Sequence, residues 1–580
     1  MGGQRPSPAG LGRARLRPVA GRGAALRHRE PAGPRGGGPL RLARDPDRGY
    51  ARAAARGLAR RRAARRRLRA DGAGDRPSPR SAGGAAGRHG RAGGAVTARI
   101  APLAASALTR GLAPMASPFA VGVAARAGGQ IIAFALVVVA ARHLGLDAFG
   151  TYAVAWAGAV IATSFVYTGF YHALLRADDL EACIDTLFWV KIAVAGAGGA
   201  ILAAAGLIVG GPGAPIGGAL FAVAPLPLLA VPTAWNEAQL WRAGRARAAS
   251  LQVLAGEATG LAAAVAALDA GLGLWGLILS RYVASLTGLV VTSALVRRCP
   301  RARFAAGEAR TASRTAWPLW GTTGIGMFSA YGADLVLAAF LAPAAVGAYR
   351  SGARIAVTAS DVVLQPVRML GWSRLARLER EGDRDGIARS WRGDVALACA
   401  MLWPASTGLA LLAEPLVVLV FDPSWAAAAP VLAVLALARA LSVPMALMEP
   451  ALMCTGRGAL QFRLRLASGA ALLLALLTLG RFGPVEAAWA VTISTGAMSL
   501  VCLAAVARVL GLSARAVATA FLPGAGLAAV CGSSVFALAA LVAPLPLLAA
   551  TLAHLALGAA LWAAGMAILF RLKVIALPRV

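Results

Sequence analysis

Five polar side chains recur at helical spacing within one apolar stretch of the chain. Arg350, Arg354, Thr358, Asp361 and Gln365 follow one another at steps of four, four, three and four residues, which places them on one face of a helix. A guanidinium presents a planar fork of donors that suits phosphate. Such a stripe could line a cavity that binds an anion, or it could form structural bonds between helices.

Asp334 poses a related problem, because it lies inside the apolar run FSAYGADLVLAAFL, residues 328–341. A charge at the centre of a membrane helix costs roughly 2.5–3.5 kcal/mol on insertion scales. A carboxylate that faces Arg350 or Arg354 would be compensated, whereas either group alone would be a buried, unpaired charge. We therefore expect Asp334 to be the structural partner of these arginines. The alternative is a switch, in which an anionic ligand displaces the carboxylate from Arg354 and Asp334 takes up a proton.

The composition indicates what class of protein holds these residues. The chain has 580 residues, of which 58% are hydrophobic and 14% charged, and its mean hydropathy is +0.66. Soluble domains carry about 25% charged residues, so much of this chain is not expected to meet water. The sequence contains no CxxC, HExxH, GxSxG or P-loop motif. We therefore expect a protein that is not an enzyme and that has no metal site and no cofactor.

Apolar runs of about 20 residues follow one another from Phe119 onward, and this is the length at which a helix crosses about 30 Å of hydrocarbon. We predict an all-α polytopic membrane protein with about 14 transmembrane helices. The predicted spans are 119–141, 149–171, 186–209, 216–235, 249–268, 273–296, 317–341, 345–369, 394–414, 425–448, 464–482, 485–507, 518–542 and 546–570. Arginines concentrate in alternate loops, so the positive-inside rule predicts that both termini are cytoplasmic.

Residues 1–114 differ from the rest of the chain. They contain 26 Arg and 5 Asp or Glu, which accounts for +21 of the net charge of +34. A segment of Arg, Gly, Ala and Pro cannot bury enough apolar surface to fold, so we expect a disordered extension. It could be a basic arm for nucleic acid or anionic lipid, or a targeting peptide. We favour a mis-set translation start with Met115 as the true initiator, and we expect no nucleic-acid partner.

Two turns in the sequence match each other. LGLDAFGTY (residues 144–152) and LAPAAVGAY (residues 341–349) both read L-x-x-x-A-x-G-x-Y and are offset by 197 residues. Chance could produce so short a match, but a repeat would give two six-helix lobes of the same topology. We predict an N-lobe of helices 1–6 at 115–300, a C-lobe of helices 7–12 at 301–512, and helices 13–14 with a cytoplasmic tail at 513–580.

These segments carry a family resemblance. ARHLGLDAFGTYAVAWA (residues 141–157) resembles the first-helix exit of the polysaccharide-transport or O-antigen flippases of the multidrug/oligosaccharidyl-lipid/polysaccharide exporter superfamily. ADLVLAAFLAPAAVGAYRSGARI (residues 333–355) is similar to the seventh-to-eighth helix region of that family, including its Asp, and residues 414–437 and 451–464 are similar to later segments. The resemblance covers about 119–510. The sequence departs from the family pattern at Asp422 and in the N-terminal extension.

The resemblance implies a flippase of the bacterial inner membrane. Such a protein moves a polyprenyl-diphosphate-linked oligosaccharide between leaflets by alternating access, for O-antigen, capsule or exopolysaccharide assembly. Its partners would include membrane lipid and a polysaccharide polymerase with export machinery. For the diphosphate we single out Arg126, Arg281, Arg350, Arg354 and Gln365, with Arg439 as a further cation. For the sugars we single out Trp156 and Tyr167, and for a charge pair or coupling Asp334 and Asp361. Tyr152 and Tyr171 are expected in the interfacial belt, and Lys191 is expected to snorkel to the surface.

Two other functions fit part of the pattern. A cation-coupled multidrug exporter belongs to the same superfamily, but its usually cationic substrates are a poor match for a cavity rich in arginine. A membrane polysaccharide polymerase or ligase would need large periplasmic loops to hold catalytic groups, and the loops predicted on that side are very short.

Overall fold

The structure is a computed structural model that describes residues 118–168, 180–572 and 574–575. All of them belong to one compact unit, residues 101–580. The first helices are α3 (Pro118–His143), α4 (Leu146–Tyr167), α6 (Leu180–Ile208), α7 (Pro215–Val223), α8 (Leu226–Arg242), α9 (Ala246–Asp269), α10 (Gly273–Val296) and α11 (Ala306–Phe340). They are followed by α12 (Pro343–Glu381), α13 (Arg384–Leu411), α14 (Ala413–Val420), η1 (Pro423–Ala428), α15 (Ala429–Leu441), α16 (Val443–Cys454), α17 (Gly458–Leu479), η2 (Gly480–Phe482), α18 (Pro484–Val509), α19 (Ala514–Val542) and α20 (Leu547–Arg571). No strand occurs among these residues.

Twelve helical segments of the described chain are long and apolar enough to cross a membrane. The predicted fold class, an all-α polytopic membrane protein, is therefore confirmed. The other two predicted spans coincide with α3 and α12, which are not among these twelve segments. In α3 the side chains before Gly128 lie outside the described part of the chain, and the remaining apolar stretch Gly128–His143 is shorter than a membrane span. In α12 the arginines and aspartate of the polar stripe lower the hydropathy, so the count of fourteen stays a prediction.

Two of the predicted spans are interrupted at prolines. The fourth predicted span consists of α7 and α8, which meet at Pro225, and the tenth consists of η1, α15 and α16, with Pro444 in the first turn of α16. Proline lacks an N–H and its ring clashes with the preceding turn, which favours a break or a kink in the helix. Several helices also extend beyond their predicted spans. One of them is α8, which continues past the predicted boundary at 235 to Arg242 and so includes Glu237.

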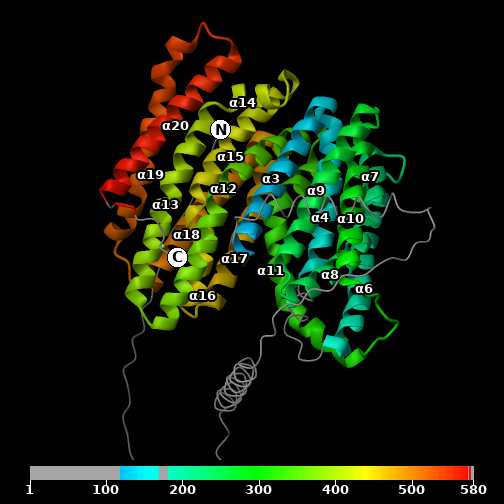
Figure 1. The fold of residues 1–580 in the computed structure, drawn as a ribbon. Coiled ribbons are helices and arrows are strands. Elements are labelled where there is room, and N and C mark those ends of the chain that lie inside the picture. Colours follow the sequence, from blue (N-terminus) through cyan, green and yellow to red (C-terminus); the bar gives the residue numbers. More distant parts are fainter. Residues whose placement is uncertain (1–117, 169–179, 573, 576–580) are drawn as a thin grey trace, which may run out of the picture. The chain divides into compact units, whose positions relative to one another are not determined.

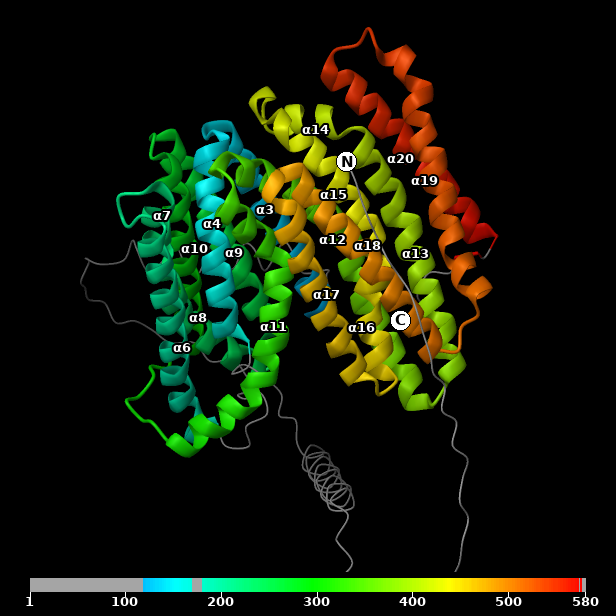
Figure 2. The same cartoon turned by 180° about the vertical axis from the view of Figure 1, so that it is seen from behind.

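The helix α12 lies between two groups of helices. Figures 1 and 2 show α6–α10 grouped on one side and α13, α19 and α20 on the other. The helix α12 packs along α4 and also contacts α13 and α15. Its residues are therefore well placed to line cavities between helices from both halves of the chain.

The matching turns of the sequence meet where α4 and α12 begin. A Cβ atom on Gly150 would overlap the carbonyl of Pro343, and one on Gly347 would overlap the carbonyl of Leu146. Asp147 Oδ1 also accepts the backbone N–H of Ala344 at 3.2 Å. The glycines allow the two helix starts to approach closely. The division into an N-lobe, a C-lobe and two further helices stays a prediction.

Candidate functional site

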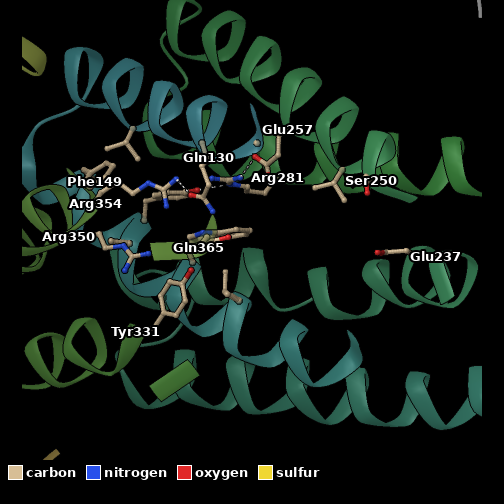
Figure 3. A pocket seen from close by; sticks show the side chains of 18 of the residues that line it. Gln130, Phe149, Glu237, Ser250, Glu257, Arg281, Tyr331, Arg350, Arg354 and Gln365 are labelled. Carbon is tan, nitrogen blue, oxygen red and sulfur yellow. Dashed lines mark hydrogen bonds and ion pairs between the residues drawn. The ribbon is translucent and has the colours of Figure 1, made fainter. Parts of the chain in front are cut away.

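A cavity of about 470 Å³ lies beside α12 and is lined by side chains from α3, α4, α8, α9, α10, α11 and α12 (Figure 3). We call it the central cavity. It brings together five of the predicted substrate-binding residues: Trp156, Arg281, Arg350, Arg354 and Gln365. They come from α4, α10 and α12, so the site is assembled by packing of helices that are far apart in the sequence.

Arg281 is held on three sides. Its Nε donates to the hydroxyl of Tyr152 at 2.8 Å, and its Nη1 lies 3.4 Å from the Glu257 carboxylate. Its guanidinium also stacks 4.3 Å above the ring of Trp156. A guanidinium over an aromatic face is attracted by the ring quadrupole. These contacts fix the orientation of Arg281 while leaving it on the cavity wall.

Arg350 is paired with Asp334. Its Nη1 lies 3.0 Å from Asp334 Oδ2, and its guanidinium stacks 4.5 Å from the ring centre of Tyr331. Asp334 is 1% exposed, so Arg350 rather than water balances its charge; its buried Oδ1 has no hydrogen-bond partner among the described residues. This geometry gives Asp334 the ion-pair contact that its position in an apolar run requires.

Arg354 has a different environment from that of Arg350, one helical turn away. Its Nη2 donates to Gln130 Oε1 at 3.3 Å, and its buried Nε has no hydrogen-bond partner within the described part of the chain. No carboxylate of that part lies within ion-pair distance of it. Arg354 therefore presents a cation to the central cavity that the surrounding described side chains do not neutralise.

Asp361 and Arg439 form a further ion pair beyond the central cavity. Arg439 Nη2 lies 3.2 Å from Asp361 Oδ1, and its Nε donates to Ser360 Oγ at 2.6 Å. Gln365 donates to the other Asp361 oxygen at 3.4 Å. Asp361 and Arg439 line a second cavity of about 380 Å³. The polar stripe of α12 therefore serves two cavities.

A third cavity, of about 540 Å³, shares Trp156 and Arg281 with the central cavity. Tyr167 lies on its wall and is absent from the lining of the central cavity. Glu237 and Glu257 line both cavities. These two glutamates were not among the predicted site residues. An acidic residue within the predicted span 249–268 was a usable signal for Glu257, whereas Glu237 lay beyond the predicted end of its span.

Two sequence expectations were wrong. Lys191 does not snorkel to the surface: it is 2% exposed, and its Nζ has no hydrogen-bond partner among the described residues. Tyr152 is not in an interfacial belt, because it is 5% exposed and bonds to Arg281 in the cavity wall. In both cases contacts with other helices, which the sequence does not reveal, set the position of the side chain.

Two predicted residues lie partly or wholly outside the described structure. Arg126 belongs to α3, but its side chain is outside the described part, and Tyr171 lies within 169–179, which the structure does not describe. Across the described residues, no group of three or more His, Cys, Asp or Glu could hold a metal ion.

Comparison with solved structures identifies the fold. The chain is similar to the lipid II flippase MurJ in an inward closed conformation, with a TM-score of 0.63 and 10% identity over 78% of this chain and 99% of that chain. It is also similar to an inward-facing multidrug resistance MATE family transporter of the MOP superfamily, with a TM-score of 0.53 and 12% identity over 66% of this chain and 96% of that chain. At these identities the similarity concerns the fold.

Sequence comparison is more specific. The succinoglycan biosynthesis transport protein ExoT of Rhizobium meliloti (strain 1021) is 26% identical over 339 residues, which are 57% of this chain and 67% of that protein. Residues 139–430 match the family described as polysaccharide biosynthesis protein. The predicted family is thus confirmed, and the chain belongs to this polysaccharide biosynthesis family of membrane transporters.

Proposed function

We propose that this protein flips a polyprenyl-diphosphate-linked oligosaccharide across the bacterial inner membrane by alternating access, for O-antigen, capsule or exopolysaccharide assembly. The protein moves its substrate and catalyses no bond change. The observation that carries the proposal is Arg354, a cation on the wall of the central cavity with no carboxylate partner in the described chain.

Placing a cation such as Arg354 at membrane depth costs free energy. A charge at membrane depth is retained where it faces a cavity or a partner. A diphosphate supplies the negative charge that Arg354 lacks, and charge-assisted bonds between arginine and phosphate are among the stronger hydrogen bonds in proteins. Arg281 and Arg350 lie on the same wall, so a bound diphosphate would meet three guanidiniums.

The comparisons support this proposal. The relative from Rhizobium meliloti is a succinoglycan biosynthesis transport protein, and MurJ, whose fold is similar, is a lipid II flippase. A transporter also needs no catalytic constellation. We therefore favour transport over a polysaccharide polymerase or ligase activity.

A multidrug exporter is the second candidate, because Glu237 and Glu257 line the central and third cavities. Carboxylates at these positions could bind a cationic drug, and the fold is also that of a MATE transporter. Against this candidate, Glu257 already pairs with Arg281, and three arginines oppose two glutamates on the wall of the central cavity.

Reconstitution of the full chain in liposomes separates the two functions. We expect transfer of a fluorescent polyprenyl-diphosphate oligosaccharide between leaflets and no uptake of a lipophilic cationic dye. Arg354→Ala should slow lipid transfer about 10- to 100-fold, the effect of losing one charge-assisted hydrogen bond. Arg354→Lys should recover only part of the rate, since an ammonium lacks the planar fork.

The control is Arg481→Ala, which removes an arginine that stacks on Phe482 and lines none of the three cavities. It should leave the transfer rate unchanged. Dye transport without lipid transfer would support the exporter instead. Full lipid transfer by Arg354→Ala would remove the role given to this arginine.

A further inference from the structure

The second cavity adjoins the central cavity along α12. It is lined by residues of α11, α12, α15, α16, α17 and α18, and it shares Tyr331, Arg350 and Arg354 with the central cavity. These three side chains therefore form the partition between the two spaces. A ligand bound to Arg354 can extend to either side of this partition.

Hydroxyl groups dominate the polar lining of the second cavity. Ser442 donates to the carbonyl of Arg439 at 2.7 Å, and Ser494 donates to the carbonyl of Val491 at 3.1 Å. Because these protons are used within the helices, the serine oxygens offer lone pairs to the cavity. Thr495 adds another hydroxyl to the same wall. The second cavity is thus rich in acceptors that are held in place by helical backbone.

The charged groups of this cavity are already paired, with one exception. Arg350 faces Asp334 and Arg439 faces Asp361. Two donors, Arg439 and Gln365, also hold Asp361 in position at 3.2 and 3.4 Å. A multiply charged anion would find only Arg354 uncompensated, whereas an uncharged group with many hydroxyls would find both fixed donors and fixed acceptors.

We propose that the second cavity binds the uncharged sugar residues of the substrate that lie next to the diphosphate. This inference rests on the proposed lipid-linked substrate. In such a substrate the diphosphate stands between the lipid and the glycan. A phosphate held by Arg354, at the partition, therefore places the adjoining sugar at the entrance of the second cavity.

Other occupants fit the same space less well. An isoprenoid tail would exclude water from the serine oxygens and from the Asp361–Arg439 pair and would offer no hydrogen bond in its place, which is costly. A metal cation would meet the three arginines on the wall. A sugar offers donors to Asp361 and to the serine oxygens, and acceptors to the guanidiniums. The volume of about 380 Å³ lies within the range of small-ligand sites.

Binding measurements on the full-length protein in lipid nanodiscs test this inference. The two probes are polyprenyl diphosphate without sugar and the same lipid carrying an uncharged oligosaccharide. Ser494→Leu fills the cavity, and we expect it to weaken binding of the sugar-bearing lipid at least about tenfold without affecting the sugar-free lipid. Thr495→Val removes one hydroxyl with little change of shape, and it should weaken binding of the sugar-bearing lipid about three- to tenfold, as for one hydrogen bond.

Controls separate failure of this inference from failure of the proposed function. Thr478→Val removes an exposed threonine hydroxyl of α17 that lies outside the cavity, and it should bind both lipids as the unchanged protein does. Arg354→Ala should weaken binding of both. Equal losses for the two lipids, or no loss in either cavity variant, would overturn the glycan site alone. An unchanged protein that binds neither lipid would overturn the proposed function and the glycan site together.

Discussion

Three of the four arginines that line the three cavities each face a carboxylate: Arg281 with Glu257, Arg350 with Asp334, and Arg439 with Asp361. Removing charges from water is tolerated when a partner compensates each of them. Arg354, which has no such partner among the described residues, is the exception that we assign to the substrate. The sequence predicted that Asp334 would face an arginine at its depth. It did not indicate which one, because spacing along a helix does not determine how two helices are rotated against each other.

Asp334→Asn should destabilise the protein, because it leaves Arg350 without its carboxylate. Removing one member of a buried ion pair costs about 3–5 kcal/mol. A thermal unfolding assay in detergent should therefore show a lower midpoint. A second change, Arg350→Gln, should restore most of the loss, whereas Arg354→Gln should not.

The matched control is Asp269→Asn, which disrupts an exposed pair with His143 at 3.1 Å. Exposed pairs contribute about 0–1 kcal/mol, so its midpoint should stay close to that of the unchanged protein. Normal stability of Asp334→Asn together with lost transport would contradict the structural role. It would favour the alternative of a proton-coupled switch.

At the scale of elements, the helical spacing of the α12 residues carried most of the information. It placed Arg350, Arg354 and Gln365 on one face, and all three line the central cavity. The same spacing could not show which of these residues line the central cavity and which line the second cavity. The division between the cavities depends on which helices pack on either side of α12. Glu237 was missed for another reason: the predicted span ended at residue 235, whereas α8 continues for about two more turns to Arg242.

Gly150→Ala should weaken the crossing of α4 and α12. A Cβ atom there would overlap the backbone carbonyl of Pro343, and backbone cannot move aside as easily as a flexible side chain. Overpacking typically costs about 1–3 kcal/mol, which should appear as a lower unfolding midpoint. Gly196→Ala is the control, because a Cβ atom on Gly196 in α6 would meet nothing within 4 Å. That change should be neutral or stabilise by up to about 1 kcal/mol. Equal midpoints for the two variants would show that the crossing is not tight.

At the scale of the whole molecule, the sequence predicted the helical class and most span positions, because apolar runs of membrane length are a local signal. Contacts between distant segments have no such signal. Trp425, which is fully buried, donates its indole N–H to the carbonyl of Ala141 at 2.9 Å and meets Phe149 edge-on at 5.3 Å. Nothing near any of these residues in the sequence indicates the pairing. It results from packing of the whole bundle.

The number of crossings is a testable property of the whole molecule and depends on α12. This helix has 39 residues, about 58 Å at 1.5 Å per residue, which is enough to cross about 30 Å of hydrocarbon despite its charges. If it crosses, its two ends lie on opposite sides of the membrane. We expect the thiol introduced by Ala342→Cys to react with a membrane-impermeant thiol reagent in spheroplasts. The thiol introduced by Glu381→Cys should react only in inverted vesicles.

The background for both variants is Cys299→Ser, because Cys299 is exposed whereas the other five cysteines are buried. Cys299 of the unchanged protein is itself a control for the predicted cytoplasmic side: it follows α10 in an arginine-rich loop and should label like Glu381→Cys. If Ala342→Cys and Glu381→Cys react from the same side, α12 does not cross. Every later loop would then lie on the opposite side from the one predicted, and fourteen spans would be wrong. Labelling of Cys299 from outside, with Ala342→Cys and Glu381→Cys also exchanging sides, would instead invert the whole orientation while leaving the count unchanged.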